Sequence, residues 1–175
     1  MSDIDNIISY LRTMAHIPYM WWDGDSWMAD NTPPFWVSAK STSSYSAPTS
    51  EYIRSKGGIN CAGLMNLGLQ YGGLNPPGIN TNYPGGTWAW GEFMIWEKYD
   101  HKHLYPRGSI VLRKYRNETD QGHLAMITTD DENNLIHSSA VEGMVIEVPI
   151  KIVNLFAGTD YFEYVSTPDM WMNYS

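Results

Sequence analysis

The chain of 175 residues is long enough for one domain with a substantial core, and 43% of its residues are hydrophobic. Its formal net charge of −8 at pH 7 argues against a nucleic-acid partner or an anionic membrane, because both require a basic surface. The only cysteine, Cys61, excludes an intramolecular disulfide and any metal site built from several cysteines.

The first residues are acidic and no long apolar run follows them, so the sequence predicts no signal peptide. No stretch approaches transmembrane length. We therefore expect synthesis in the cytoplasm, and any work outside the cell would need another export route. The sequence gives no indication of an oligomeric state.

A first helix is predicted by apolar residues that recur at helical spacing from Ile4 to Leu11, with Ser2 or Asp3 as its cap. It should end before Pro18. In the aromatic segment that follows, Tyr19 can either pack in the core or direct its hydroxyl into a site.

Residues 23–57 form a long polar connection, of the kind that often serves as a lid or binding loop. An insertion without a role is the alternative. A short helix is predicted near its end, between Pro48 and Lys56, closed by two glycines.

The stretch from Gly57 to Gly73 predicts a helix that carries Cys61 in its first turn. Asn60 is a good N-cap residue, and an apolar inner face is expected at Leu64, Met65 and Leu69. The helix dipole and the unpaired N–H groups of a first turn favour a thiolate, which is the nucleophilic form. A buried cysteine that only fills space is the alternative.

The second half of the chain predicts one more short helix and then strands. The helix spans 88–99, and the His101-x-His103 pair after it indicates a solvated loop rather than a metal site, so neither metal nor cofactor is expected. About five mostly antiparallel strands follow, at 109–115, 122–128, 135–139, 141–148 and 160–165. With no domain boundary in view, we predict a single α+β domain over 1–175, with an insertion at 23–57.

Three residues form a candidate catalytic set. Cys61 is the candidate nucleophile, His123 opens one predicted strand, and His137 lies on the next strand with the parity to share its face. A cysteine nucleophile needs a base, and the base needs a third group to fix its tautomer. Simple pairing across the 130–134 turn sets His137 opposite Ile127, so contact with His123 requires a bulge, strong twist or another register.

Five motifs resemble those of the NlpC-type cell-wall cysteine endopeptidases, and their order along the chain is the order found in that family. Asn60-Cys61-Ala62-Gly63 is similar to their Asp-Cys-Ser-Gly nucleophile motif, and Gly122-His123-Leu124-Ala125-Met126-Ile127 to their Gly-His-Val-Gly-Ile base strand. Leu135-Ile136-His137 resembles the strand of their third polar residue. Pro18-Tyr19-Met20-Trp21 and Pro106-Arg107-Gly108-Ser109 resemble their Pro-Tyr segment and their Pro-Gly-Asp-Leu strand entry.

The resemblance implies a papain-like fold, in which the nucleophile helix packs on a mostly antiparallel sheet. It implies Cys61 as nucleophile, His123 as base and His137 as the residue that orients the base. Tyr19 would line the site with its hydroxyl near the oxyanion, which the Cys61 N–H would also meet. The chain departs from the motif at Asn60 and Ala62, where the family usually has Asp and Ser.

The function that follows is hydrolysis of an amide by a Cys-His-His triad, with peptidoglycan stem peptides as the expected substrate. Two alternatives stay open. One is a cysteine protease or deamidase directed at proteins, of viral or effector type, which the absent signal peptide and long connection favour. The other is a binding module without catalysis, which the altered residues beside Cys61 favour.

Overall fold

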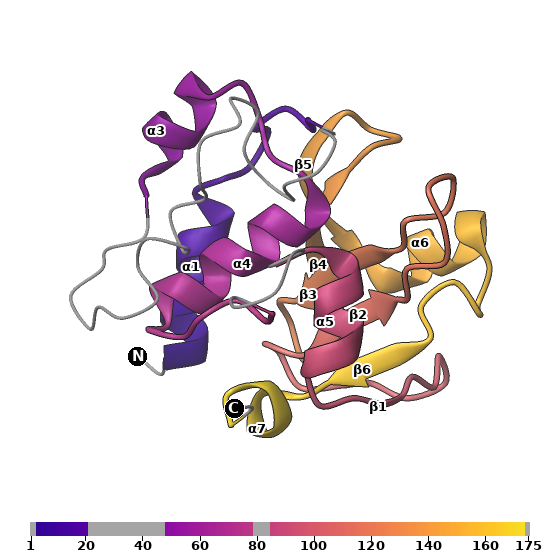
Figure 1. The fold of residues 1–175 in the computed structure, drawn as a ribbon. Coiled ribbons are helices and arrows are strands. Elements are labelled where there is room, and N and C mark those ends of the chain that lie inside the picture. Colours follow the sequence, from indigo (N-terminus) through magenta and orange to yellow (C-terminus); the bar gives the residue numbers. More distant parts are fainter. Residues whose placement is uncertain (1–2, 21–47, 79–84, 174–175) are drawn as a thin grey trace.

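The computed structural model describes residues 3–20, 48–78 and 85–173, and in this part of the chain helices pack on a six-stranded sheet (Figure 1). The helices are α1 (Asp3–Arg12), α3 (Ser50–Ser55), α4 (Cys61–Tyr71), α5 (Thr87–Phe93), α6 (Ile150–Ala157) and α7 (Pro168–Trp171). The strands are β1 (Glu97–Lys98), β2 (Ile110–Arg113), β3 (His123–Ile127), β4 (Asn134–Ser139), β5 (Met144–Pro149) and β6 (Tyr164–Ser166).

The strands lie in the order β1-β6-β2-β3-β4-β5, and the neighbours pair antiparallel. This confirms the predicted α+β class and its mostly antiparallel sheet, with one short strand more than expected. None of the described helices combines the length and the apolar character that crossing a bilayer requires. The 23–57 connection lies outside the described residues as far as residue 47, and its described end forms α3.

The helix that carries Cys61 begins and ends where the sequence predicts. The Asn60 side chain accepts a hydrogen bond of 2.7 Å from the Gly63 N–H, and Gly72 follows the last turn. The expectation of a single apolar face was too narrow, because every residue from Ala62 to Gln70 is buried. In Figure 1, α4 crosses the centre of the molecule beside α1, with the sheet to its right.

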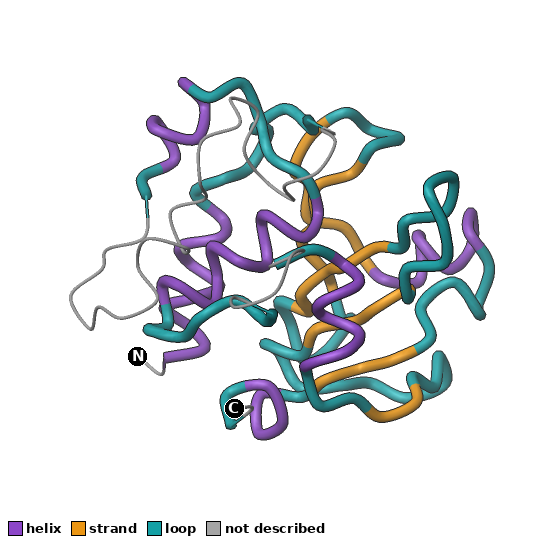
Figure 2. Tube along the Cα trace, viewed as in Figure 1, coloured by secondary structure: helices purple, strands orange, loops and turns teal. Residues whose placement is uncertain are grey.

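Two hydrophobic clusters cover the two faces of the sheet. Because side chains alternate along a strand, Leu124 and Met126 pack with α1 and α4, whereas Ala125 and Ile127 pack in the second cluster. That second cluster also contains Ile150 of α6 and Phe162 of the loop after α6. Figure 2 shows the strands of the sheet between α1 and α4 on one side and α6 on the other.

Three parts of the secondary structure differ from the prediction. The helix expected over 88–99 ends at Phe93, where the Trp96 indole donates to the Trp90 carbonyl (2.8 Å) and the chain turns into β1. Helices α6 and α7 were not predicted. Helix α6 follows directly on β5 through Pro149, so the apolar residues of strand and helix run together in the sequence without a separating turn.

Gly122 sets the entry into β3 immediately before His123. Its φ is +82°, and a Cβ at this position would lie 2.2 Å from the Arg113 carbonyl oxygen of the paired strand. A side chain is therefore excluded by the backbone of β2 as well as by the left-handed conformation. The glycine lets the strand that carries His123 approach β2 closely.

We expect Gly122→Ala to lower the free energy of unfolding by about 2–4 kcal/mol, because a backbone clash adds to the conformational strain. Gly73→Ala is the matched control: its φ is +80°, but no atom lies within 4 Å of the added Cβ, so only the strain of about 1 kcal/mol should appear. Urea denaturation of the two variants and the wild type measures these changes in the free energy of unfolding. Equal losses in the two variants would contradict the role given to the β2 backbone.

Candidate active site

Cys61 is the first residue of α4 and is partly exposed. The Leu124 and Ala62 amides and the Thr87 hydroxyl face its sulfur, and each of them favours the thiolate. Leu124 directly follows His123, so the start of β3 lies beside the first turn of α4. The sulfur therefore has donors from α4, α5 and β3 around it.

The two histidines predicted to cooperate lie in contact. His123 Nε2 and His137 Nδ1 are 2.6 Å apart, with their rings in an edge-to-face arrangement. If Nε2 of His123 carries the proton, it donates to His137, and Nδ1 of His123 is left with a lone pair. Nδ1 forms no hydrogen bond with any of the described residues. This tautomer leaves a basic nitrogen available to a neighbouring thiol.

The register of β3 and β4 differs from the simple pairing across the 130–134 turn, and this difference brings the histidines together. Met126 pairs with Ile136 and Ile127 with Leu135, and this register, continued along β4, sets His137 opposite Ala125. The expected pairing of His137 with Ile127 was therefore wrong by two residues. His123 and His137 become diagonal neighbours on one face, a separation that two imidazole rings can span.

Tyr19 lies beside the nucleophile because its segment is hydrogen-bonded between the chain before α4 and the turn before β5. Its N–H donates to the Gly143 carbonyl (2.8 Å), and the flanking residues exchange backbone hydrogen bonds with Ile59. Burial, followed by the effects of Cys61 and Tyr161, raises the pKa of Tyr19 to about 12. The phenol is therefore a hydrogen-bond donor at neutral pH.

The electrostatics of Cys61 differ from the prediction of a favoured thiolate. Burial raises the pKa of the thiol, and this effect exceeds the opposing effect of the donors from Leu124, Ala62 and Thr87. The first-turn amides act in the expected direction but are outweighed by desolvation. Burial therefore favours the neutral thiol over the thiolate in the free protein.

The histidine pair is neutral as well. Burial and the neighbouring His137 lower the pKa of His123 to about 3, and burial lowers the pKa of His137 to about 4. His137 is only 6% exposed, and its Nε2 is buried without a hydrogen-bond partner among the described residues. A protonated imidazole in this position would lose its hydration without gaining a counter-ion.

Two side chains beside Cys61 were missed by sequence reasoning. Thr87, at the start of α5, faces the sulfur, and Tyr161 is close enough to the thiol for Cys61 to influence its titration. The ring centroids of Tyr161 and His123 are 6.2 Å apart. Neither residue belongs to a recognisable motif, so the sequence offered no signal for them.

His101 and His103 lie in an exposed turn, and His103 Nε2 is 3.6 Å from a carboxylate oxygen of Asp100. Within the described ranges, no group of three His, Cys, Asp or Glu side chains is arranged to hold a metal ion.

Solved structures that share this fold include those of NlpC/P60 proteins. The chain superposes on the P60 domain of an antigen from M. avium subspecies paratuberculosis with a TM-score of 0.52 and 16% identity, covering 92% of both chains. An NlpC/P60 family protein from Bacillus cereus gives a TM-score of 0.54 at 16% identity, over 93% of this chain and 39% of that one.

The peptidoglycan hydrolase RipB from Mycobacterium tuberculosis gives a TM-score of 0.52 at 14% identity, over 92% of this chain and 63% of that one. The chain thus spans less than two thirds of the Bacillus and RipB chains. At the level of sequence, no family model and no curated protein matches. The structural matches confirm the NlpC-type, papain-like fold that the five motifs predicted.

We expect alkylation of Cys61 by iodoacetamide to rise with pH along a curve whose midpoint lies above that of an unperturbed thiol, about 8.5. Thr87→Val should slow the reaction at pH 8 by roughly threefold to tenfold, because a donor to the thiolate is lost. Thr13→Val is the control, because the Thr13 hydroxyl, directly after α1, donates to the Tyr10 carbonyl and not to the sulfur. A Thr87 variant that reacts like the control would show that the hydroxyl does not act on the sulfur.

The buried histidines should also make stability fall in acid. An unfolded histidine binds a proton near pH 6.5 and the folded pair only near pH 4 and 3, so stability is complete above about pH 6.5 and decreases as the pH falls. Each histidine contributes up to about 1.4 kcal/mol per pH unit in this window. The His137→Asn variant should show a shallower loss between pH 6 and 5 in urea titrations, and the exposed His103→Asn variant should not. Equal slopes in all three proteins would contradict neutral burial of the pair.

Proposed function

We propose that the protein is a cysteine amide hydrolase in which Cys61 attacks, His123 transfers the proton and His137 orients His123. The contact of 2.6 Å between His123 Nε2 and His137 Nδ1 carries the proposal, because it fixes the base and leaves Nδ1 for the thiol. The Leu124 amide beside the sulfur supports it further, since the residue after the base lies against the nucleophile.

The reaction proceeds through an acyl-thioester. The Cys61 thiol passes its proton to His123 Nδ1 as Sγ attacks the carbonyl carbon, which gives a tetrahedral oxyanion. The imidazolium then protonates the leaving amine, and the C–N bond breaks. A water molecule, deprotonated by His123, attacks the thioester, releases the acid and restores the thiol.

The oxyanion needs donors that are in position before the reaction. The Cys61 N–H, at the start of α4, and the Tyr19 hydroxyl are the candidate donors. Tyr19 suits this role because its pKa of about 12 keeps the hydroxyl protonated. Its backbone is held by hydrogen bonds on both sides, so the donor is fixed relative to α4.

For the substrate we propose the stem peptides of peptidoglycan. The support comes from the fold, which it shares with the peptidoglycan hydrolase RipB, and from the motifs that resemble wall endopeptidases. The net charge of −8 supplies no electrostatic attraction to an anionic wall. Affinity would therefore depend on hydrogen bonds and aromatic contacts in the site.

The test is incubation with purified muropeptides and identification of the products by mass spectrometry. We expect cleavage of an amide bond by the wild type, none above background by Cys61→Ala, and a kcat lowered by about 10²–10⁴ in His123→Ala. His137→Asn should retain more activity than His137→Ala, because its amide oxygen can still accept from His123 Nε2.

His103→Ala, on the exposed turn, is the control and should match the wild type. A folded wild type that leaves muropeptides of several stem chemistries intact would reject the wall substrate. Activity on proteins in the same assay would instead support the protease or deamidase alternative. Full biological activity of Cys61→Ala would support the binding module.

A further inference from the structure

Tyr161 is a half-buried aromatic residue beside the candidate base that has no part in the chemistry proposed above. It lies in the loop between α6 and β6, next to Phe162, which is buried in the second hydrophobic cluster. The His123 ring centroid is 6.2 Å from that of Tyr161 and 6.1 Å from that of Phe162. Its hydroxyl forms no hydrogen bond with any of the described residues.

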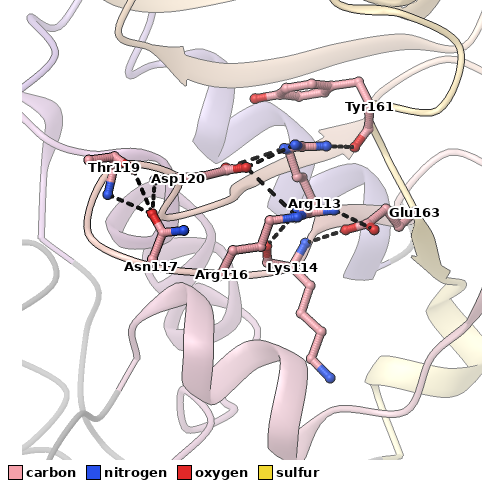
Figure 3. A network of polar contacts seen from close by, with 8 residues as sticks. All are labelled: Arg113, Lys114, Arg116, Asn117, Thr119, Asp120, Tyr161 and Glu163. Carbon is pink, nitrogen blue, oxygen red and sulfur yellow. Dashed lines mark hydrogen bonds and ion pairs between the residues drawn. The ribbon is translucent and has the colours of Figure 1, made fainter.

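The Arg113 guanidinium packs against the Tyr161 ring (Figure 3). The guanidinium carbon is 5.0 Å from the ring centroid, and Nη1 donates to the Tyr161 carbonyl at 3.2 Å. Nε and Nη2 of the same side chain donate to the two carboxylate oxygens of Asp120, at 3.3 and 2.9 Å. The planar guanidinium is thus fixed on three sides, which a lysine could not reproduce.

The sheet places the Arg113–Tyr161 contact beside the candidate base, His123. Arg113 is the β2 residue directly paired with His123 of β3, so the two side chains leave the sheet on the same face. The loop after Tyr161 is fixed as well, because Glu163 accepts from the Lys114 N–H and from Arg116 Nη2. Strand pairing and these hydrogen bonds therefore position the ring, the base and the guanidinium relative to one another.

We propose that the Tyr161 hydroxyl donates a hydrogen bond to a carbonyl of the peptide substrate beside the scissile bond, and that the Arg113–Asp120 pair positions the phenol for this contact. The inference rests on the proposed function, which supplies the peptide. Burial and the nearby Cys61 raise the pKa of Tyr161 to about 12, so the hydroxyl stays a donor throughout the neutral range. Together with Tyr19 it would present two phenols to the substrate, from distant parts of the chain.

Binding is measured without turnover, in a Cys61→Ala background, by titration with a disaccharide tetrapeptide from peptidoglycan. Tyr161→Phe, which keeps the ring, should raise Kd by roughly twofold to tenfold, as expected for one neutral hydrogen bond. Tyr71→Phe is the matched control, because Tyr71 ends α4 about 15 Å along the helix from Cys61. An unchanged Kd in Tyr161→Phe, or no binding by Cys61→Ala, overturns the inference.

The role of Arg113 is tested by a double-mutant cycle in the same background. Arg113→Lys should weaken binding when Tyr161 is present and add nothing when Tyr161 is already Phe. Independent effects would overturn the positioning role. If the affinity depends on Tyr161 but the wild type cleaves no peptide, the proposed hydrolase function is rejected and the proposed Tyr161 contact is retained. The results therefore distinguish failure of one proposal from failure of the other.

Discussion

The backbone of Ile59 joins the three segments on which the site depends. Its N–H donates to the Pro18 carbonyl (3.0 Å), and its carbonyl accepts from the Met20 N–H (3.2 Å) and from the Ser138 hydroxyl (2.7 Å). Ile59 itself is completely buried. The segment of Tyr19, the strand of His137 and the start of the helix of Cys61 are therefore joined at one residue. Displacement of any one of these would leave buried polar groups unpaired, which is costly.

Burial makes the resting site neutral, and this sets the order of events in the proposed reaction. The pKa of Cys61 is raised and that of both histidines is lowered, so an ion pair of thiolate and imidazolium is disfavoured before substrate binds. Charge would then appear only during attack, when the oxyanion forms beside its donors and His137 Nδ1 accepts from the protonated base. The donors around the sulfur matter most at that moment, because they are already oriented.

Local rules of sequence explain the parts of the fold that the sequence predicted. Helix α4 is specified by a cap residue, an apolar run and a terminal glycine pair, all within its own stretch. The β3–β4 register was not predictable in the same way, since it depends on how the turn and the two sheet faces pack. Thr87 and Tyr161 reach the site only through tertiary contacts of α5 and of the α6–β6 loop, so no pattern along the chain indicates them.

The residue before the cysteine illustrates which features of the motif the fold requires. The family that the motifs resemble usually has Asp there, whereas this chain has Asn60, whose side-chain oxygen accepts a capping hydrogen bond from the Gly63 N–H. The cap is therefore kept while a carboxylate beside the sulfur is absent. A carboxylate would add like-charge repulsion to the thiolate, on top of the desolvation that already raises the pKa of Cys61. On physical grounds, Asn60 keeps the helix start intact and favours the nucleophilic form of Cys61 more than Asp would.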